Sequence, residues 1–137
     1  MNGVLVRLLA AVSLAIASIG ASAQAVEIEG VKLEPTAQVG GAALQLNGAG
    51  LRTRVFFKVY VAGLYVPQKA KDANTLLAQK GPRRVAITML RNVDSDTFSA
   101  SLVEGLKNNL SEAQFTGFKA QIDALNANFK ADRKSVV

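Results

Sequence analysis

Residues 51–66 constrain the fold of this chain most strongly, because β-branched and aromatic residues, which favour extended strands, fill most of this run. Read as one strand, the run has two faces. The first is typical of a protein core and carries Leu51, Thr53, Val55, Phe57, Val59, Val61 and Tyr65. The second mixes cations with aromatic rings, which a plain solvent-exposed face seldom needs, and carries Arg52, Arg54, Phe56, Lys58, Tyr60, Ala62 and Leu64.

Shorter apolar runs predict further strands around this one. We expect an edge strand with a turn at Gly30 over residues 26–33, a short strand over 42–46 and another over 83–90. The string Asn47-Gly48-Ala49-Gly50 is typical of a turn or a bulge, because Asn and Gly tolerate positive φ angles. Gly63 indicates a bend or a close approach of backbone within residues 51–66.

Periodic apolar residues predict helices after these strands. A short helix is expected over 72–79, and a longer one is expected to begin at a cap from Asp94, Ser95 or Asp96 and to reach Asn109. A capping box of Ser111 and Gln114 predicts a last helix. The apolar stripe of that helix predicts packing on something large and consists of Phe115, Phe118, Ile122, Leu125 and Phe129. The order of elements predicts an α+β domain.

Residues 1–23 are predicted to be a signal peptide. Arg7 precedes an apolar run over 8–19, and Ala21-Ser22-Ala23 is a small-x-small site of the kind that signal peptidase accepts. The run is short for a membrane span, which disfavours the alternative of an uncleaved anchor. Cleavage near Ala23 predicts a periplasmic or secreted bacterial protein with no stable membrane anchor after removal of the signal.

Residues 132–137 are predicted to be a non-native tail. Asp132-Arg133-Lys134-Ser135-Val136-Val137 is the translation of a widely used sequencing adapter, and no Gly or Pro closes the helix before it. A genuine basic tail is the alternative. On this hypothesis the domain occupies residues 24–131 and is incomplete at its C-terminus, which fits a sheet with so few predicted strands.

Composition argues against several kinds of chemistry. The 137 residues include no Cys and no His, so no disulfide framework and no thiol or imidazole nucleophile is predicted. The acidic residues are scattered, and the sequence predicts no metal site and no cofactor. The formal net charge of +6 is not gathered into a basic stripe with interleaved aromatics, so we expect no nucleic-acid partner. The oligomeric state is left open.

Two neighbouring motifs resemble a known family. They are Leu46-Asn47-Gly48-Ala49-Gly50-Leu51-Arg52 and Phe57-Lys58-Val59-Tyr60-Val61-Ala62-Gly63-Leu64-Tyr65. Together they resemble the chalcone isomerase family, and most closely its small exported bacterial branch, the chalcone isomerase-like proteins. The resemblance implies an open-faced β-sandwich, in which helices lie on one side of a large antiparallel sheet and a ligand cleft lies between them. Members of this shape normally continue with further strands and helices.

The resemblance places only part of a catalytic site on this chain. Plant-type members cyclise chalcones with an Arg, a Thr, a Tyr and an Asn, and these positions correspond here to Arg52, Tyr60, Phe98 and Gly105. Phe98 has no hydroxyl with which to polarise an enolate oxygen. The pattern therefore argues against chalcone cyclisation, and Arg52 is the one catalytic candidate if the protein is an isomerase.

Non-catalytic members of this fold bind fatty acids through the Arg and a Tyr. By this resemblance Arg52 and Tyr60 are expected to hold the carboxylate of a small amphiphilic anion, with Phe56 and Phe98 as apolar walls. The residues alone equally allow Arg52 to be an exposed cation beside a turn. Two other functions stay open: an isomerase (intramolecular lyase) acting on a chalcone-like enone, and a protein-interaction module whose cleft its own side chains fill.

Overall fold

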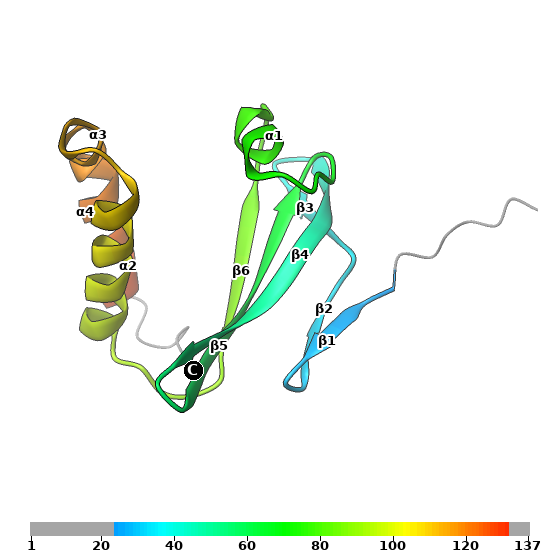
Figure 1. Ribbon diagram of the computed structural model, residues 1–137, viewed down its shortest axis with the longest axis horizontal. Coiled ribbons are helices and arrows are strands. Elements are labelled where there is room, and N and C mark those ends of the chain that lie inside the picture. Colours follow the sequence, from blue (N-terminus) through cyan, green and yellow to red (C-terminus); the bar gives the residue numbers. More distant parts are fainter. Residues whose placement is uncertain (1–23, 132–137) are drawn as a thin grey trace, which may run out of the picture.

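The computed structural model describes residues 24–131, whose main parts are an antiparallel sheet of four strands and a separate layer of helices (Figure 1). The sheet has the order β3-β4-β5-β6. Its strands are β3 (Thr36–Val39), β4 (Ala42–Arg54), β5 (Phe57–Val66) and β6 (Arg84–Met89). The predicted signal peptide and the predicted non-native tail lie outside the described residues.

The remaining elements lie on the two sides of this sheet and at one of its ends (Figure 1). A small hairpin of β1 (Val26–Ile28) and β2 (Val31–Leu33) precedes it. A short helix, α1 (Ala73–Ala78), links β5 to β6. The helical layer follows β6 and contains α2 (Ser95–Asn109), α3 (Glu112–Gly117) and α4 (Lys119–Ala131). Helices on one side of an antiparallel sheet confirm the predicted α+β architecture (Figure 1).

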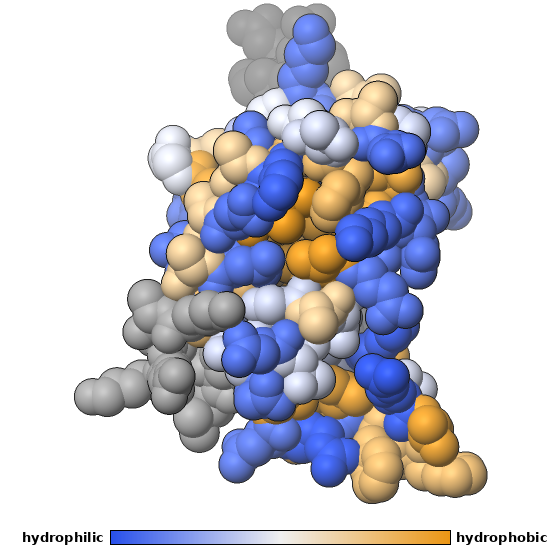
Figure 2. Space-filling model, turned by 90° about the vertical axis from the view of Figure 1, so that its left-hand side faces the viewer, coloured by the Kyte–Doolittle hydropathy of each residue, from blue (hydrophilic) through white to orange (hydrophobic). Residues whose placement is uncertain are grey.

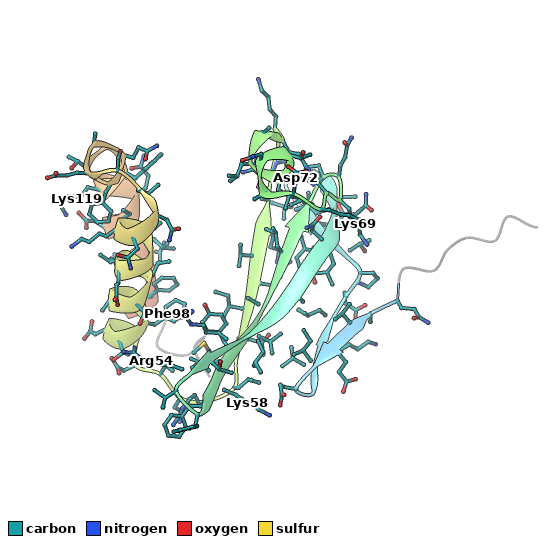
Figure 3. The ribbon with its side chains drawn as sticks, in the orientation of Figure 1. Arg54, Lys58, Lys69, Asp72, Phe98 and Lys119 are labelled. Atoms are coloured by element: carbon teal, nitrogen blue, oxygen red, sulfur yellow. The ribbon has the colours of Figure 1, made fainter. Side chains whose placement is uncertain are left out.

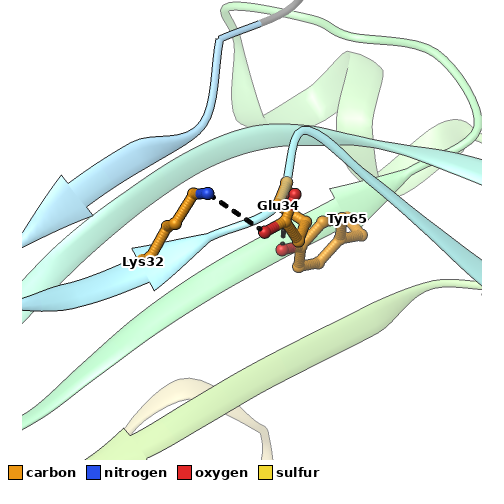
Figure 4. Close-up of polar contacts among 3 residues, drawn as sticks. All are labelled: Lys32, Glu34 and Tyr65. Atoms are coloured by element: carbon orange, nitrogen blue, oxygen red, sulfur yellow. Dashed lines mark hydrogen bonds and ion pairs between the residues drawn. The ribbon is translucent and has the colours of Figure 1, made fainter.

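The hydrophobic core lies between the β1–β2 hairpin and one face of the sheet. Leu44 of β4 and Val61 of β5 are completely buried there, and Leu33 of β2 packs against them. The hydroxyl of Tyr65 donates a hydrogen bond of 2.9 Å to the backbone carbonyl of Glu34, which ties the segment after β2 to β5 (Figure 4). The core thus covers only one face of the sheet and leaves the other face toward the helices.

The prediction of a single strand over residues 51–66 is wrong. Val55 and Phe56 form a two-residue turn, and β4 and β5 pair antiparallel on either side of it. Val55 has a φ of 56°, which a β-branched residue rarely adopts. Sequence composition could not show this turn, because glycine or asparagine normally occupies such a position.

Two β-bulges change which face each residue occupies. One lies at Asn47, between the pairs Leu46–Tyr65 and Gly48–Leu64, as the sequence suggested for a turn or a bulge. The other leaves Val59 unpaired between the pairs Arg52–Tyr60 and Thr53–Lys58. The predicted core-like face is therefore split. Its members Val61 and Tyr65 are in the core, whereas Val55, Phe57 and Val59 lie toward the helices.

The predicted helix starts are confirmed. Asp94 caps α2, and Ser111 and Gln114 form the capping box of α3. The last predicted helix is divided at Phe118, which separates α3 from α4. Its apolar stripe packs on α2 rather than on the sheet: Ile122 is buried, and the rings of Phe129 and Phe98 meet edge to face at 5.0 Å.

Among the glycines of residues 24–131, Gly63 is the one at which the backbone comes closest to its neighbours. A Cβ atom there would lie 3.1 Å from Cδ1 of Leu46 and 3.3 Å from Cδ2 of Leu33. We expect Gly63→Ala to lower the free energy of unfolding by about 1–3 kcal/mol, because an added methyl would overpack this part of the core. Urea denaturation followed by circular dichroism would measure the loss.

Gly50→Ala is the matched control for this prediction. A Cβ atom at Gly50 would meet no atom within 4 Å, and Gly50 also lies in a strand of the same sheet. We expect this control to keep or slightly raise the stability, since alanine loses less backbone entropy on folding. Equal losses for both variants would contradict the close-approach explanation.

Candidate functional site

A cavity lies between the helix-facing side of the sheet and α2, at the end where the β4–β5 hairpin turns. Its volume is about 640 Å³, and most of its wall is apolar. The sheet side contributes Val59 of β5 and Ile87 of β6. Helix α2 contributes Phe98, Leu102 and Leu106, which share one face of the helix because they are spaced four residues apart. Such a cavity suits the apolar part of a small ligand.

Three arginines provide the charge at this cavity. Arg52 and Arg54 come from the end of β4, and Arg91 follows β6. No aspartate or glutamate of residues 24–131 lines the cavity. Within residues 24–131, no carboxylate forms an ion pair with any of the three guanidinium groups. The site therefore offers positive charge that the described part of the protein does not neutralise.

Arg52 and Tyr60 are brought together by the pairing of β4 with β5. They are directly opposite one another in the register of the hairpin, and both line the cavity. Side chains opposite one another in an antiparallel pair lie on the same face of the sheet. The sequence placed them on one face along a single strand, whereas the structure places them there across two strands. A guanidinium and a phenol hydroxyl side by side can both donate hydrogen bonds to one carboxylate.

The other two arginines lie nearer the turn of the hairpin. Arg54 pairs in register with Phe57, and Figure 3 shows Arg54 and Phe98 at the same end of the gap between the hairpin and α2. The guanidinium of Arg91 stacks 4.3 Å from the centroid of the Phe57 ring. This cation–π contact holds Arg91 at the cavity wall without neutralising its charge.

The four residues predicted to bind a ligand do not all reach the cavity. Arg52, Tyr60 and Phe98 line it, as does Gly105, the position that corresponds to the family's Asn. Phe56 does not line it, because this residue forms the turn of the hairpin and its side chain is 93% exposed. The apolar wall expected from Phe56 is instead supplied by Phe57 and Val59, which the turn and the bulge direct to this side.

Sequence reasoning did not nominate Arg54, Arg91 or the polar side chains that α2 adds to the cavity. Those polar side chains are Thr97, Ser101 and Asn109. Arg54 had a usable signal, since it is two residues from Arg52 and so on the same face of a strand. No sequence pattern indicated Arg91, because its place at the cavity depends on the path of the chain after β6.

The first turn of α2 is held by Asp94. Its carboxylate accepts hydrogen bonds from the backbone N–H and the hydroxyl of Thr97, at 2.8 and 2.7 Å. The side-chain bond, followed by the backbone bond, lowers the pKa of Asp94 from 3.8. The charged carboxylate also lies at the positive end of the helix dipole. This cap fixes the end of α2 that carries Thr97 and Phe98 into the cavity wall.

We expect Asp94→Ala to lower the stability at neutral pH. Because the pKa of Asp94 is lowered by folding, its contribution is present above 3.8 and is lost as the pH falls through the lowered value. The gap in urea midpoint between parent and variant should therefore shrink in acid. A gap of the same size at every pH would contradict the assignment, and Asp94→Asn, which caps without a charge, serves as the control.

Within residues 24–131, no group of three or more acidic side chains comes together where it could hold a metal ion. Across the same range, no helix is long and apolar enough to cross a membrane.

A family model described as chalcone isomerase-like matches residues 25–135. No curated protein and no solved structure matches the chain. The matched range contains the whole sheet, the cavity and the start of every helix described above.

Proposed function

This chain belongs to the chalcone isomerase-like family, and from this premise we propose that it binds a small amphiphilic anion, such as a fatty acid, without catalysing its conversion. The observation that carries the proposal is the cavity itself. Its wall is largely apolar, three arginines face it, and no acidic side chain of residues 24–131 does. An apolar chain with one anionic head matches that distribution of charge.

Arg52 and Tyr60 are the proposed contacts of the anionic head. Arg52 can donate two parallel hydrogen bonds to a carboxylate, and Tyr60 can add a third from the facing strand. Arg54 and Arg91 raise the positive potential around the same point. The apolar chain would then extend along α2, over Phe98, Leu102 and Leu106.

The volume agrees with a ligand of this kind. Ligand pockets usually measure roughly 300–1,000 Å³. The cavity measures about 640 Å³, which is in the middle of that range.

A catalytic alternative rests on the same pair of residues. Tyr60 has a hydroxyl beside Arg52, and this pair can polarise the carbonyl of an enone. The position that supplies a Tyr in plant-type members is Phe98, whose ring instead packs against Phe129. With no hydroxyl at Phe98, electrostatic stabilisation of an enolate depends on Tyr60 and Arg52 alone, and we favour binding over catalysis.

The test is to delipidate the purified protein and titrate it with a long-chain fatty acid, using isothermal titration calorimetry and native mass spectrometry. We expect saturable binding of one molecule per chain. A chalcone is then offered under the same conditions, and its absorbance is followed. Turnover of the chalcone that depends on Arg52 would show that the protein is an isomerase and not only a binding protein. If neither fatty-acid binding nor chalcone turnover is observed, the cavity would be assigned to contact with a protein partner.

We also propose that the protein is exported and that residues 1–23 are removed. The support is the sequence pattern of a charged start, a short apolar run and a small-x-small site. Expression in a bacterium with a C-terminal tag, followed by fractionation and mass spectrometry, tests this. We expect a periplasmic chain that begins at or near Gln24. A full-length chain that stays with the membrane would indicate an uncleaved anchor.

A further inference from the structure

The turn of the β4–β5 hairpin presents large apolar side chains to solvent. Val55, Phe56 and Phe57 are 79%, 93% and 57% exposed. Figure 2 shows hydrophobic residues protruding at the lower end of the molecule, the end where Figure 1 places this turn. Three adjacent apolar residues with this exposure are unusual, because soluble proteins normally place such side chains in the core.

Basic side chains lie directly behind this apolar turn. Arg54 precedes it on β4, and Lys58 lies just behind Phe57 on β5. They point to different sides, since Arg54 lines the cavity and Lys58 forms an ion pair of 2.6 Å with Glu29 in the turn of the β1–β2 hairpin (Figure 3). Arg52 and Arg91 add further positive charge on the cavity side. The end of the hairpin therefore has an apolar tip with cations set back from it.

The backbone of the turn adds an independent observation. Val55 occupies the first central position with a φ of 56°, where glycine is usually found and a β-branched residue is strained. A turn that served only to join two strands would be more stable with glycine at this place. The chain thus keeps an apolar side chain at its tip at the expense of backbone strain.

From these observations we propose that the tip of the β4–β5 hairpin docks on the surface of an anionic lipid bilayer. Phe56 and Val55 enter the boundary between head groups and acyl chains, and Arg54 contacts the anionic head groups. Long basic side chains suit this position, because their stems lie against apolar groups while their charges stay in the polar layer. A bilayer also accepts a protruding ring without a preformed pocket, which a protein partner would have to provide.

This docking would leave the protein peripheral and reversibly bound. It does not depend on the cavity holding a ligand, so it can be tested without one. Because Arg54, Val55 and Phe57 also line the cavity, the docked orientation would turn the cavity mouth toward the bilayer.

The test is co-sedimentation of the full chain with vesicles of phosphatidylcholine, with and without phosphatidylglycerol. We expect binding to the anionic vesicles, little to the neutral ones and a strong decrease at about 0.5 M salt, where charges are screened within a few ångströms. Phe56→Ser should weaken binding about tenfold or more. Arg54→Gln should weaken it about fivefold. Lys58→Gln should weaken it less, because Glu29 already balances the charge of Lys58.

Three further variants test whether vesicle binding depends on the tip of the hairpin. Leu77→Ser removes another exposed apolar side chain (73%) from α1, at the opposite end of the sheet, and should change nothing (Figure 1). Val55→Gly should raise the stability by relieving strain and still weaken binding. Because the chain has no Trp, Phe56→Trp provides a unique fluorophore, whose emission should shift to the blue on anionic vesicles and be quenched by brominated lipids.

Several results would overturn the proposal. One is equal binding of parent and Phe56→Ser to anionic vesicles, which would indicate a general effect of net charge. Another is a Phe56→Trp emission that does not respond to vesicles. A third is self-association in analytical ultracentrifugation that Phe56→Ser abolishes, with no vesicle binding, which would assign the tip to a second copy of the chain.

Discussion

Replacing Arg52 by Met is expected to weaken the binding of a long-chain fatty acid about 10- to 100-fold. The variant keeps much of the volume of the side chain and removes the guanidinium that faces Tyr60 across the hairpin. Hydrogen bonds to charged groups contribute about 1.5–3 kcal/mol each, which corresponds to this range of affinity. Calorimetric titration of the delipidated parent and variant measures the change.

The ligand provides the sharpest control for this expectation. A fatty alcohol of the same chain length has the same apolar part and no charge, so it should bind the parent and Arg52→Met with nearly equal affinity. Arg84→Met is the matched protein control, because Arg84 is an exposed cation of β6 that does not line the cavity. Tyr60→Phe should give a smaller loss, about three- to tenfold, since it removes one uncharged donor. Equal weakening of acid and alcohol would mean that Arg52 shapes the cavity and does not bind the anion.

The strands and helices could be predicted from the sequence wherever a local pattern decides them. The caps at Asp94 and Ser111 act within a few residues, and both helices begin where these caps indicated. The turn at Val55 and Phe56 could not be predicted, because its residues favour a strand and only the pairing of β4 with β5 imposes it. In the segment that forms the site, the pairing of β4 with β5 thus outweighed the preference of Val55 and Phe56 for an extended strand.

The residues of the site were predicted only in part. The errors in that prediction also come from the turn between β4 and β5, which was not foreseen. Arg52 and Tyr60 lie opposite one another because the turn shifts the alternation of side chains and the bulge at Val59 shifts it back. The same turn removes Phe56 from the cavity and exposes it to solvent. Arg91 could not be nominated at all, because its contact with Phe57 joins two segments that are far apart in the sequence.

Leu44→Ala is expected to cause the largest loss of stability. Leu44 of β4 is completely buried, and it packs with Leu33, Val61 and Tyr65 in the core between the sheet and the β1–β2 hairpin. Truncating a buried leucine removes its transfer free energy and leaves a cavity, so we expect a loss of about 3–5 kcal/mol. The core occupies one face of the sheet and has few completely buried side chains, which leaves little other packing to compensate.

The matched control for Leu44→Ala is Leu77→Ala, the same truncation at a position that is 73% exposed on α1. It should change the free energy of unfolding by less than about 0.5 kcal/mol, because leucine and alanine both favour a helix and little apolar surface is uncovered. In urea, Leu44→Ala should lower the midpoint by roughly 1–3 M, whereas Leu77→Ala should leave it unchanged. Similar small shifts for both would mean that the β1–β2 hairpin does not cover the sheet in solution. Since the hairpin buries one face of β4 and β5, the cavity would then lose the rigid support that sets Arg52 opposite Tyr60.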